Sequence, residues 1–79
     1  MWYLYILLCD NTSFYIGITN NLSHRLKQHQ NHNSTYTKQF NTLKLVYSQE
    51  FSNRSDAVAR EKQLKGWTKQ KKLDLIKSG

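Results

Sequence analysis

The chain has few of the residues that stabilise small folds by special means. Its 79 residues include no proline, one cysteine and three glycines. The single Cys9 excludes an internal disulfide, so we expect a cytoplasmic protein. Because Cys9 closes an apolar run, it is expected to be a small core residue rather than a nucleophile. With no proline-rich or repetitive tract to act as a linker, we expect a single domain over residues 1–79.

Acidic residues and long apolar runs are also scarce. No apolar stretch approaches the roughly 20 residues of a membrane span, so we expect no membrane partner. Five Asp and Glu face twelve Lys and Arg, which gives a formal net charge of +7. A polyanion is the natural partner of such a chain, and nucleic acid is the first candidate. A soluble protein that is merely basic is the alternative.

Hydrophobic periodicity and turn residues predict six elements in the order β-β-α-β-α-α. Two β-rich runs separated by a polar turn are typical of an antiparallel hairpin. Helix starts are indicated by Asn20 or Asn21, by Ser52 or Asn53, and by Thr68. The expected elements cover residues 2–8, 14–19, about 21–30, 43–51, about 53–65 and 69–77. This order predicts an α+β fold, a small three-stranded antiparallel sheet covered by helices.

The run 14–19 looks like a buried central strand, except for a tyrosine and a glycine within it. Period two places Tyr15, Gly17 and Thr19 on one face of this strand. Glycine inside a strand often marks the close approach of a ligand or another backbone, so Gly17 is expected to clear space on a chemical face. Alternatively, Gly17 relieves a bulge and Tyr15 is half-buried filler.

Polar residues also fall on the apolar faces of two predicted helices. Arg25 and His29 share an arc of roughly 100° with Leu22 and Leu26 on the first helix. Glu61 lies within the stripe of the second helix, which is marked by Ala57, Val58 and Leu64. A buried ion pair between Arg25 and Glu61 would explain both. A functional site explains them together with the hydroxyl of Tyr15, because burying polar groups in a small core is costly.

These residues resemble the GIY-YIG nuclease superfamily in its short, stand-alone, single-domain branch. Tyr15-Ile16-Gly17 matches the second half of the name, and Tyr3-Leu4-Tyr5 keeps only the final tyrosine of the first half. Arg25, His29 and Glu61 follow at the family's spacing, and the tail "KKLDLIK" is also similar. The chain departs from some members in having Ile18 after the YIG glycine and no asparagine beyond Asn53.

The resemblance implies a metal-dependent endonuclease that hydrolyses DNA phosphodiester bonds, with branched or damaged DNA and hence DNA repair as its setting. Glu61 would hold one Mg²⁺ or Mn²⁺ ion, and Arg25 would brace the scissile phosphate. Tyr15 is the first choice for general base and His29 is its rival, while Tyr5 would orient the water or the phosphate. We expect a phenol, a guanidinium and a carboxylate to meet in one shallow cavity.

Nucleic-acid contacts are expected around this site and over the basic last third of the chain. The expected contact residues are Gly17, Thr19, Tyr36, Lys38, Lys62, Lys65, Lys69, Lys71 and Lys72. The large family members use a separate DNA-binding domain, so targeting here is expected to come either from the domain's own surface or from a protein partner. Two alternatives stay open, namely a basic module that binds nucleic acid without cutting it, and an adaptor for an acidic protein. His24 is expected to be solvated, and a zinc site at His29 and His32 is not expected.

Overall fold

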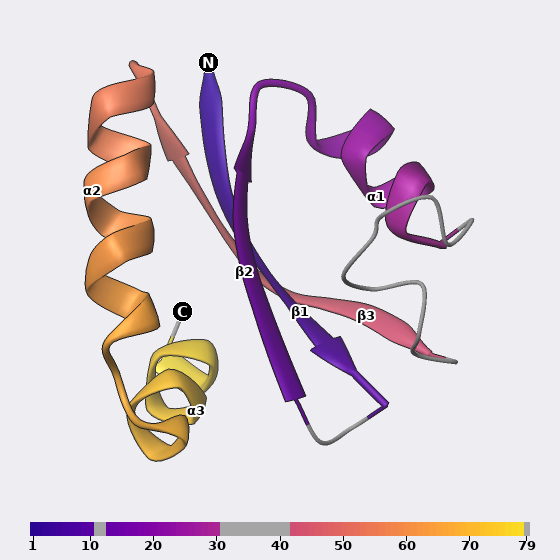
Figure 1. Ribbon diagram of the computed structural model, residues 1–79, viewed down its shortest axis with the longest axis vertical. Coiled ribbons are helices and arrows are strands. Elements are labelled where there is room, and N and C mark those ends of the chain that lie inside the picture. The colour runs from indigo at the N-terminus through magenta and orange to yellow at the C-terminus, as the bar shows by residue number, and fades with distance from the viewer. Residues whose placement is uncertain (11–12, 31–41, 79) are drawn as a thin grey trace.

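The structure of the protein is a computed structural model that describes residues 1–10, 13–30 and 42–78 (Figure 1). Its elements are β1 Trp2–Cys9, β2 Ser13–Thr19, α1 Leu22–Gln30, β3 Leu43–Phe51, α2 Arg54–Lys65 and α3 Lys69–Ser78. The predicted order and the α+β class are confirmed. His32, Tyr36 and Lys38 lie outside the described residues. Within the described ranges, no helix is long and apolar enough to cross a membrane.

The three strands form one antiparallel sheet in the order β2-β1-β3. The central strand is therefore β1, and the expectation that residues 14–19 form a central strand is wrong. The four consecutive residues of β1 from Leu4 to Leu7 are all buried. A strand that buries residues on both faces belongs in the middle of a sheet, whereas β2 leaves one edge free.

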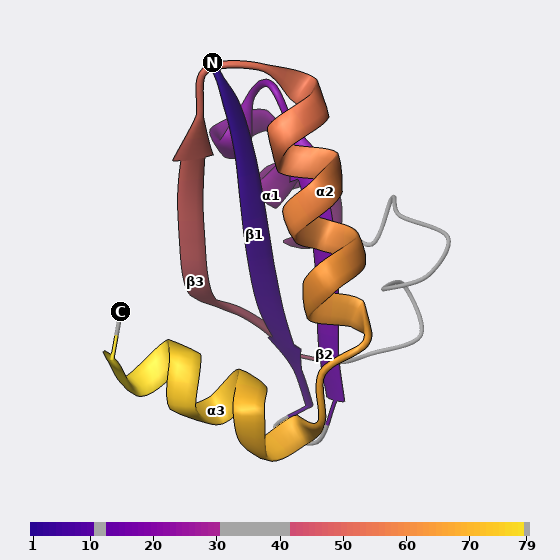
Figure 2. The same cartoon turned by 90° about the vertical axis from the view of Figure 1, so that its left-hand side faces the viewer.

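Helices cover both faces of the sheet, α2 and α3 on one face and α1 on the other (Figures 1 and 2). The face under α2 and α3 is an apolar core centred on Leu4, Ile6, Ile16 and Leu64. The face under α1 holds Tyr5, Leu7 and Cys9, with Leu22 and Leu26 packed against them. The predicted alternation of β2 follows the same division: Phe14, Ile16 and Ile18 face the apolar core.

Side-chain caps start each helix, because the first backbone N–H groups of a helix have no partner within it. Asn21 Oδ1 accepts from His24 N at 3.1 Å, and Asn53 Oδ1 accepts from Asp56 N at 2.9 Å. Thr68 Oγ1 accepts from Lys71 N at 3.3 Å. The caps predicted from the sequence are thereby confirmed, with Asn21 and Asn53 chosen over their neighbours.

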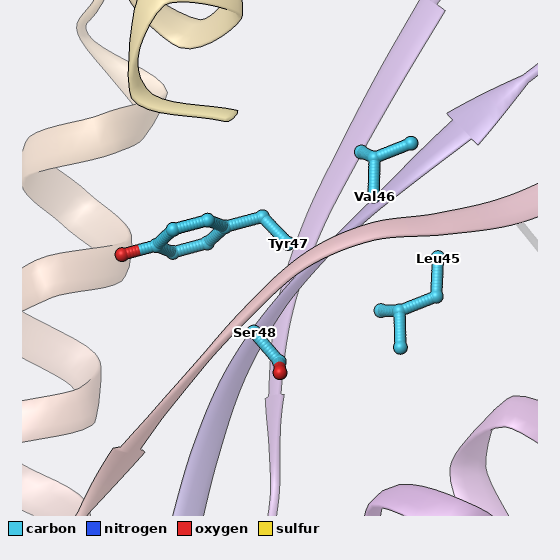
Figure 3. A pocket seen from close by; sticks show the side chains of 4 residues that line it. All are labelled: Leu45, Val46, Tyr47 and Ser48. Atoms are coloured by element: carbon cyan, nitrogen blue, oxygen red, sulfur yellow. The ribbon is translucent and has the colours of Figure 1, made fainter. Parts of the chain in front are cut away.

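A β-bulge interrupts the outer strand β3. Its register with β1 shifts between Ile6, which pairs with Tyr47, and Leu7, which pairs with Leu45, so Val46 is the extra residue. A shallow hollow of about 310 Å³ lies at this bulge, lined by Leu45 to Ser48 (Figure 3). Tyr47 points from it toward α2 (Figure 3), and its hydroxyl donates to Gln49 Oε1 at 3.3 Å. The four lining residues include no carboxylate and no base, so we place no active site there.

Candidate active site

Four of the predicted catalytic side chains meet on the face of the sheet under α1. They are Tyr5 from β1, Tyr15 from β2, and Arg25 and His29 from α1. The Tyr5 and Tyr15 ring centroids are 6.1 Å apart, and the His29 ring lies 5.7 Å from Tyr5 and 5.2 Å from Tyr15. The helical periodicity that pointed Arg25 and His29 at the sheet is thus confirmed, as is the outward position of the exposed His24.

Tyr5 is the centre of this cluster, and its side chain is fully buried. Arg25 Nε donates to the Tyr5 hydroxyl at 3.2 Å, and the same hydroxyl lies 3.0 Å from His29 Nε2. A guanidinium has donors only, so Tyr5 accepts from Arg25, and the same hydroxyl is hydrogen-bonded to His29 Nε2. Burial raises the pKa of Tyr5 to about 12, although its hydrogen bond with Arg25 acts in the opposite direction.

His29 is fully buried and holds Tyr5 in place. Burial lowers the pKa of His29 below its usual range, and the charge of Arg25 acts in the same direction. The imidazole is therefore neutral at pH 7, and its Nε2 is hydrogen-bonded to the Tyr5 hydroxyl. This arrangement satisfies two groups that would be costly to bury alone.

Arg25 has a second hydrogen-bond partner, Gln28, which was not among the predicted site residues. Its Nη1 donates to Gln28 Oε1 at 3.1 Å, so Tyr5 and Gln28 together fix the plane of the guanidinium. The hydrogen bond with Tyr5 is the main reason why the pKa of Arg25 is raised, and Tyr15 acts in the same direction. The i, i+3 spacing of Arg25 and Gln28 was the available signal.

Gly17 clears space in the cluster, but a protein side chain fills that space. A Cβ at this position would lie 2.6 Å from Tyr5 Oη and 2.8 Å from Tyr5 Cζ. Gly17 is directly opposite Tyr5 in the β1–β2 register, so the missing side chain lets the phenol lie flat across the neighbouring strand. The predicted bulge at Gly17 is not observed, because β1 and β2 pair without a register shift.

Thr19, predicted to contact nucleic acid, is engaged locally. Its hydroxyl donates to Asn21 O at 3.2 Å and accepts from Asn21 N at 3.1 Å. These bonds shape the turn between β2 and α1 and so place the first turn of the helix that carries Arg25. Thr19 therefore has a structural role in the approach to α1.

Glu61 does not join the cluster. It lies on α2, which covers the opposite face of the sheet, and its Oε2 is 3.3 Å from Lys65 Nζ. The expectation that phenol, guanidinium and carboxylate share one cavity is therefore wrong for the described structure. The two layers approach each other at the free edge of β2, where Phe14, Tyr15, Ile16, Lys65 and Lys72 line a hollow of about 250 Å³.

Glu61 fits a metal ion as part of a site with few protein ligands. The described residues contain no group of three or more His, Cys, Asp or Glu side chains suited to a metal. Mg²⁺ is commonly bound through one or two carboxylates, with water and substrate phosphate as the other ligands. The side chain of Glu61 is 20% exposed and its partner Lys65 is 57% exposed, so exchanging the amine for an ion costs little.

The remaining predictions concern Cys9 and the lysines. Cys9 is fully buried, and burial raises the pKa of its thiol, which suits the predicted core role. Lys62, Lys69 and Lys71 are exposed on α2 and α3, whereas Lys72 is half-buried. Lys71 Nζ lies 5.7 Å from the centroid of the Trp67 ring. The predicted basic surface is thus divided between two different environments.

Comparison with known proteins identifies the family. Residues 1–74 match the family model of the GIY-YIG catalytic domain. The chain belongs to the GIY-YIG family. It is 44% identical over 79 residues to the UPF0213 protein CPE1444 of Clostridium perfringens, covering 99% of this chain and 85% of that one. It is 39% identical over 74 residues to a UPF0213 protein of Limosilactobacillus reuteri, covering 90% and 77% of the two chains.

A solved structure supports the same assignment. The solution NMR structure of the UPF0213 protein BH0048 from Bacillus halodurans matches with a TM-score of 0.63 at 30% identity, over 98% of this chain and 84% of that one. The GIY-YIG protein described here therefore shares both fold and sequence with small members of a nuclease superfamily. The resemblance inferred from Tyr15-Ile16-Gly17 and the residues after it is confirmed.

Proposed function

We propose that this GIY-YIG protein is a metal-dependent endonuclease that hydrolyses phosphodiester bonds in DNA, with branched or damaged DNA as its substrate. The observation that carries the proposal is the hydrogen-bonded cluster of the buried Tyr5 and His29 with the half-buried Arg25, and with Tyr15 beside it at the free edge of β2. A purely structural cluster has no need of a guanidinium, whose partial burial is costly, on a face that α1 could fill with leucine.

Arg25 is proposed to brace the scissile phosphate. Tyr5, Gln28 and Tyr15 are its hydrogen-bond partners, and three bonds leave two of the five N–H groups of a guanidinium for a phosphate. A guanidinium fixed in one plane loses little freedom on binding and can donate two parallel hydrogen bonds to a phosphate. Preorganised positive charge of this kind stabilises the negative charge that grows on the phosphoryl oxygens during hydrolysis.

Tyr15 is proposed as the general base in preference to His29. His29 is fully buried and its Nε2 is taken up by Tyr5, so it has no direct contact with solvent water. Tyr15 is half-buried and lines the open hollow at the β2 edge. A base has to reach the proton that it removes, directly or through one water, and this requirement favours Tyr15. His29 then serves to hold Tyr5, and through it Arg25.

Glu61 is proposed to hold one Mg²⁺ or Mn²⁺ ion from the other side of the β2 edge. Its i+4 neighbour Lys65 lines the hollow with Tyr15, so Glu61 lies on the same side of α2. Four residues rise about 6 Å along a helix, and α2 runs opposite in direction to β2, so Glu61 lies beyond Lys65 toward Gly17. The ion supplies charge neutralisation at the phosphate when bound, as a hard cation with oxygen ligands does.

DNA is proposed to lie along the basic side of α2 and α3 and across the free edge of β2. The lysines there would hold its backbone without reading sequence. A protein partner is proposed to choose the DNA structure that is cut. Such an enzyme acts where the chromosome is, which in bacteria such as those that carry the relatives is the cytoplasm. A role in DNA repair follows from the choice of branched or damaged substrates.

The test is a nicking assay on supercoiled plasmid and on a branched DNA junction, with Mg²⁺ and with chelator. Wild-type protein is expected to cut only with Mg²⁺. Tyr15→Phe is expected to lose about 100-fold or more in rate, the usual contribution of a general base. Tyr47→Phe is the matched control, because its hydroxyl donates within β3, to Gln49. Full activity of Tyr15→Phe would remove Tyr15 from the role of base.

The second variant pair tests the metal ligand. Glu61→Gln is expected to abolish cutting, and Glu50→Gln, which changes an exposed carboxylate of β3, is expected to have no effect. The alternative is a module that binds nucleic acid without cutting it. It is favoured by the finding that the described residues contain no group of three or more His, Cys, Asp or Glu side chains suited to a metal. Salt-sensitive DNA binding with no Mg²⁺-dependent nicking would establish that alternative.

A further inference from the structure

The hollow at the free edge of β2 gathers side chains from three elements. Phe14, Tyr15 and Ile16 come from β2, Lys65 from the end of α2 and Lys72 from α3. Helices α2 and α3 lie on one face of the sheet (Figures 1 and 2). The Tyr15 ring packs on the other face, so residues of both layers line this hollow at the edge of β2. Its volume of about 250 Å³ accommodates a group of the size of a phosphate with its waters.

The two lysines bring two positive charges to the hollow, and Glu61 offsets only that of Lys65 among the described residues. Lys65 lines the hollow and is also ion-paired to Glu61, at 3.3 Å. Lys72 is half-buried and has no carboxylate partner among the described residues. A lysine that gives up part of its hydration without a counter-charge has a reason to be there if an anion completes the site.

Lys71, the sequence neighbour of Lys72, has a different environment. Its Nζ lies over the Trp67 ring at 5.7 Å, and it lines a separate hollow with Trp67, Asp74 and Leu75. Lys71 and Lys72 therefore carry the same charge one residue apart on α3 but face different surfaces. Their charge alone predicts equal contributions to DNA binding, whereas their positions predict unequal ones.

We infer that Lys65 and Lys72 form a phosphate-binding subsite beside Tyr15, which holds a backbone phosphate of the DNA strand next to the scissile one. This inference rests on the proposed function only in its choice of DNA as the anion. The subsite gives a specific task to two of the five lysines predicted to contact nucleic acid and leaves the other three, Lys62, Lys69 and Lys71, with diffuse attraction alone. A strand held there passes Tyr15 at the edge of the sheet, on its way to Arg25 on the other face.

The experiment measures binding rather than cutting, with a fluorescent DNA duplex in chelator and anisotropy read at several salt concentrations. Lys72→Met keeps the apolar stem and removes the charge, Lys72→Arg restores the charge, and Lys71→Met is the matched control. One lost phosphate contact lowers the slope of log K against log salt by about 0.9. Lys72→Met is expected to show that fall and to bind several-fold more weakly. Lys72→Arg and Lys71→Met should stay within about twofold of wild type, because diffuse charge far from the strand is screened.

The outcomes distinguish a failure of the subsite from a failure of the proposed function. Equal effects of Lys71→Met and Lys72→Met, with DNA bound by the wild type, would overturn the subsite and leave the nuclease proposal intact. Binding that depends on Lys72 but gives no Mg²⁺-dependent nicking would support the subsite and overturn the nuclease proposal. No DNA binding by the wild type would overturn both. Circular dichroism shows whether each variant is folded. If Lys72→Met is not folded, Lys72→Arg still tests the position, because it is expected to bind DNA like the wild type.

Discussion

The two faces of β1 use the same strand for different purposes. Toward α2 and α3, Leu4 and Ile6 are fully buried in an apolar core with Leu64. Toward α1, the residue between them, Tyr5, is equally buried but hydrogen-bonded to Arg25 and near His29 Nε2. The side chains of β1 are therefore equally buried on the two faces. The faces differ in whether the buried atoms need hydrogen-bond partners.

This difference indicates which face supplies stability and which supplies chemistry. A chain of this size has little apolar surface to bury, so one continuous core under α2 and α3 has to provide most of the hydrophobic stabilisation. The face under α1 can then carry polar groups, provided that each has a partner. Matched substitutions on the two faces test this division, and the following four are ordered by expected effect.

The largest effect is expected at the centre of the apolar face. Leu64→Ala removes a fully buried side chain, and such changes cost about 2–5 kcal/mol because a cavity is left behind. Leu45→Ala in β3 is the matched control, since Leu45 is 37% exposed, and it should cost less than about 1 kcal/mol. Urea denaturation measures both. Equal losses for the two variants would contradict a core concentrated under α2 and α3.

The next effect is expected from adding one methyl group to the polar face. Gly17→Ala would place a Cβ 2.6 Å from Tyr5 Oη, so the phenol has to move. Overpacking of this kind costs about 1–3 kcal/mol, and the shift of Tyr5 should also lower the cleavage rate through Arg25. At Gly66 the nearest atom to an added Cβ is Gln63 O, at 3.6 Å, so Gly66→Ala should be tolerated. Full stability and activity of Gly17→Ala would show that Tyr5 is not held against this strand.

Gly17 also shows how far the sequence could predict the structure. Strand periodicity put Gly17 on the same face as Tyr15, and helical periodicity put Arg25 and His29 opposite them, because both patterns are local. The group that fills the space at Gly17 depends on the pairing of β1 with β2, which places Tyr5 opposite it. A resemblance between motifs gives no such register, so the space was assigned to a ligand.

Glu61 was harder to place for the same kind of reason. Its spacing from Ala57 and Leu64 predicted correctly that it lies near the inward stripe of α2. The face of the sheet that α2 covers is decided by the connections between elements, and these are long-range features. The i, i+4 pair of Glu61 with Lys65 was visible in the sequence as a spacing. The same i, i+4 spacing is common on solvated helix faces, so the spacing alone could not show that Glu61 is mostly buried.

A smaller effect on stability, with a larger one on activity, is expected from removing one oxygen. Tyr5→Phe keeps the ring but leaves Arg25 Nε and His29 Nε2 without their partner, which costs about 1–3 kcal/mol. Because Arg25 is then free to turn, cleavage should fall by more than the loss of folded protein explains. Tyr47→Phe, which removes a half-buried hydroxyl of β3, should leave both quantities nearly unchanged. Equal cleavage rates for these two variants would separate the Tyr5 hydroxyl from catalysis.

The smallest effect concerns the pH dependence of stability. The pKa of His29 is lowered by burial and by Arg25, so below about pH 6.5 the unfolded chain binds a proton that the folded chain resists. Stability is therefore complete above pH 6.5 and falls as the pH decreases from there, by at most about 1.4 kcal/mol per pH unit. His29→Gln should flatten this acid branch in urea denaturation between pH 5 and pH 7.5. His24→Gln, which changes an exposed histidine on the same helix, should keep the wild-type slope. Identical slopes for the two variants would mean that the imidazole beside Tyr5 is not held neutral, and the polar face would then tolerate a second charge next to Arg25.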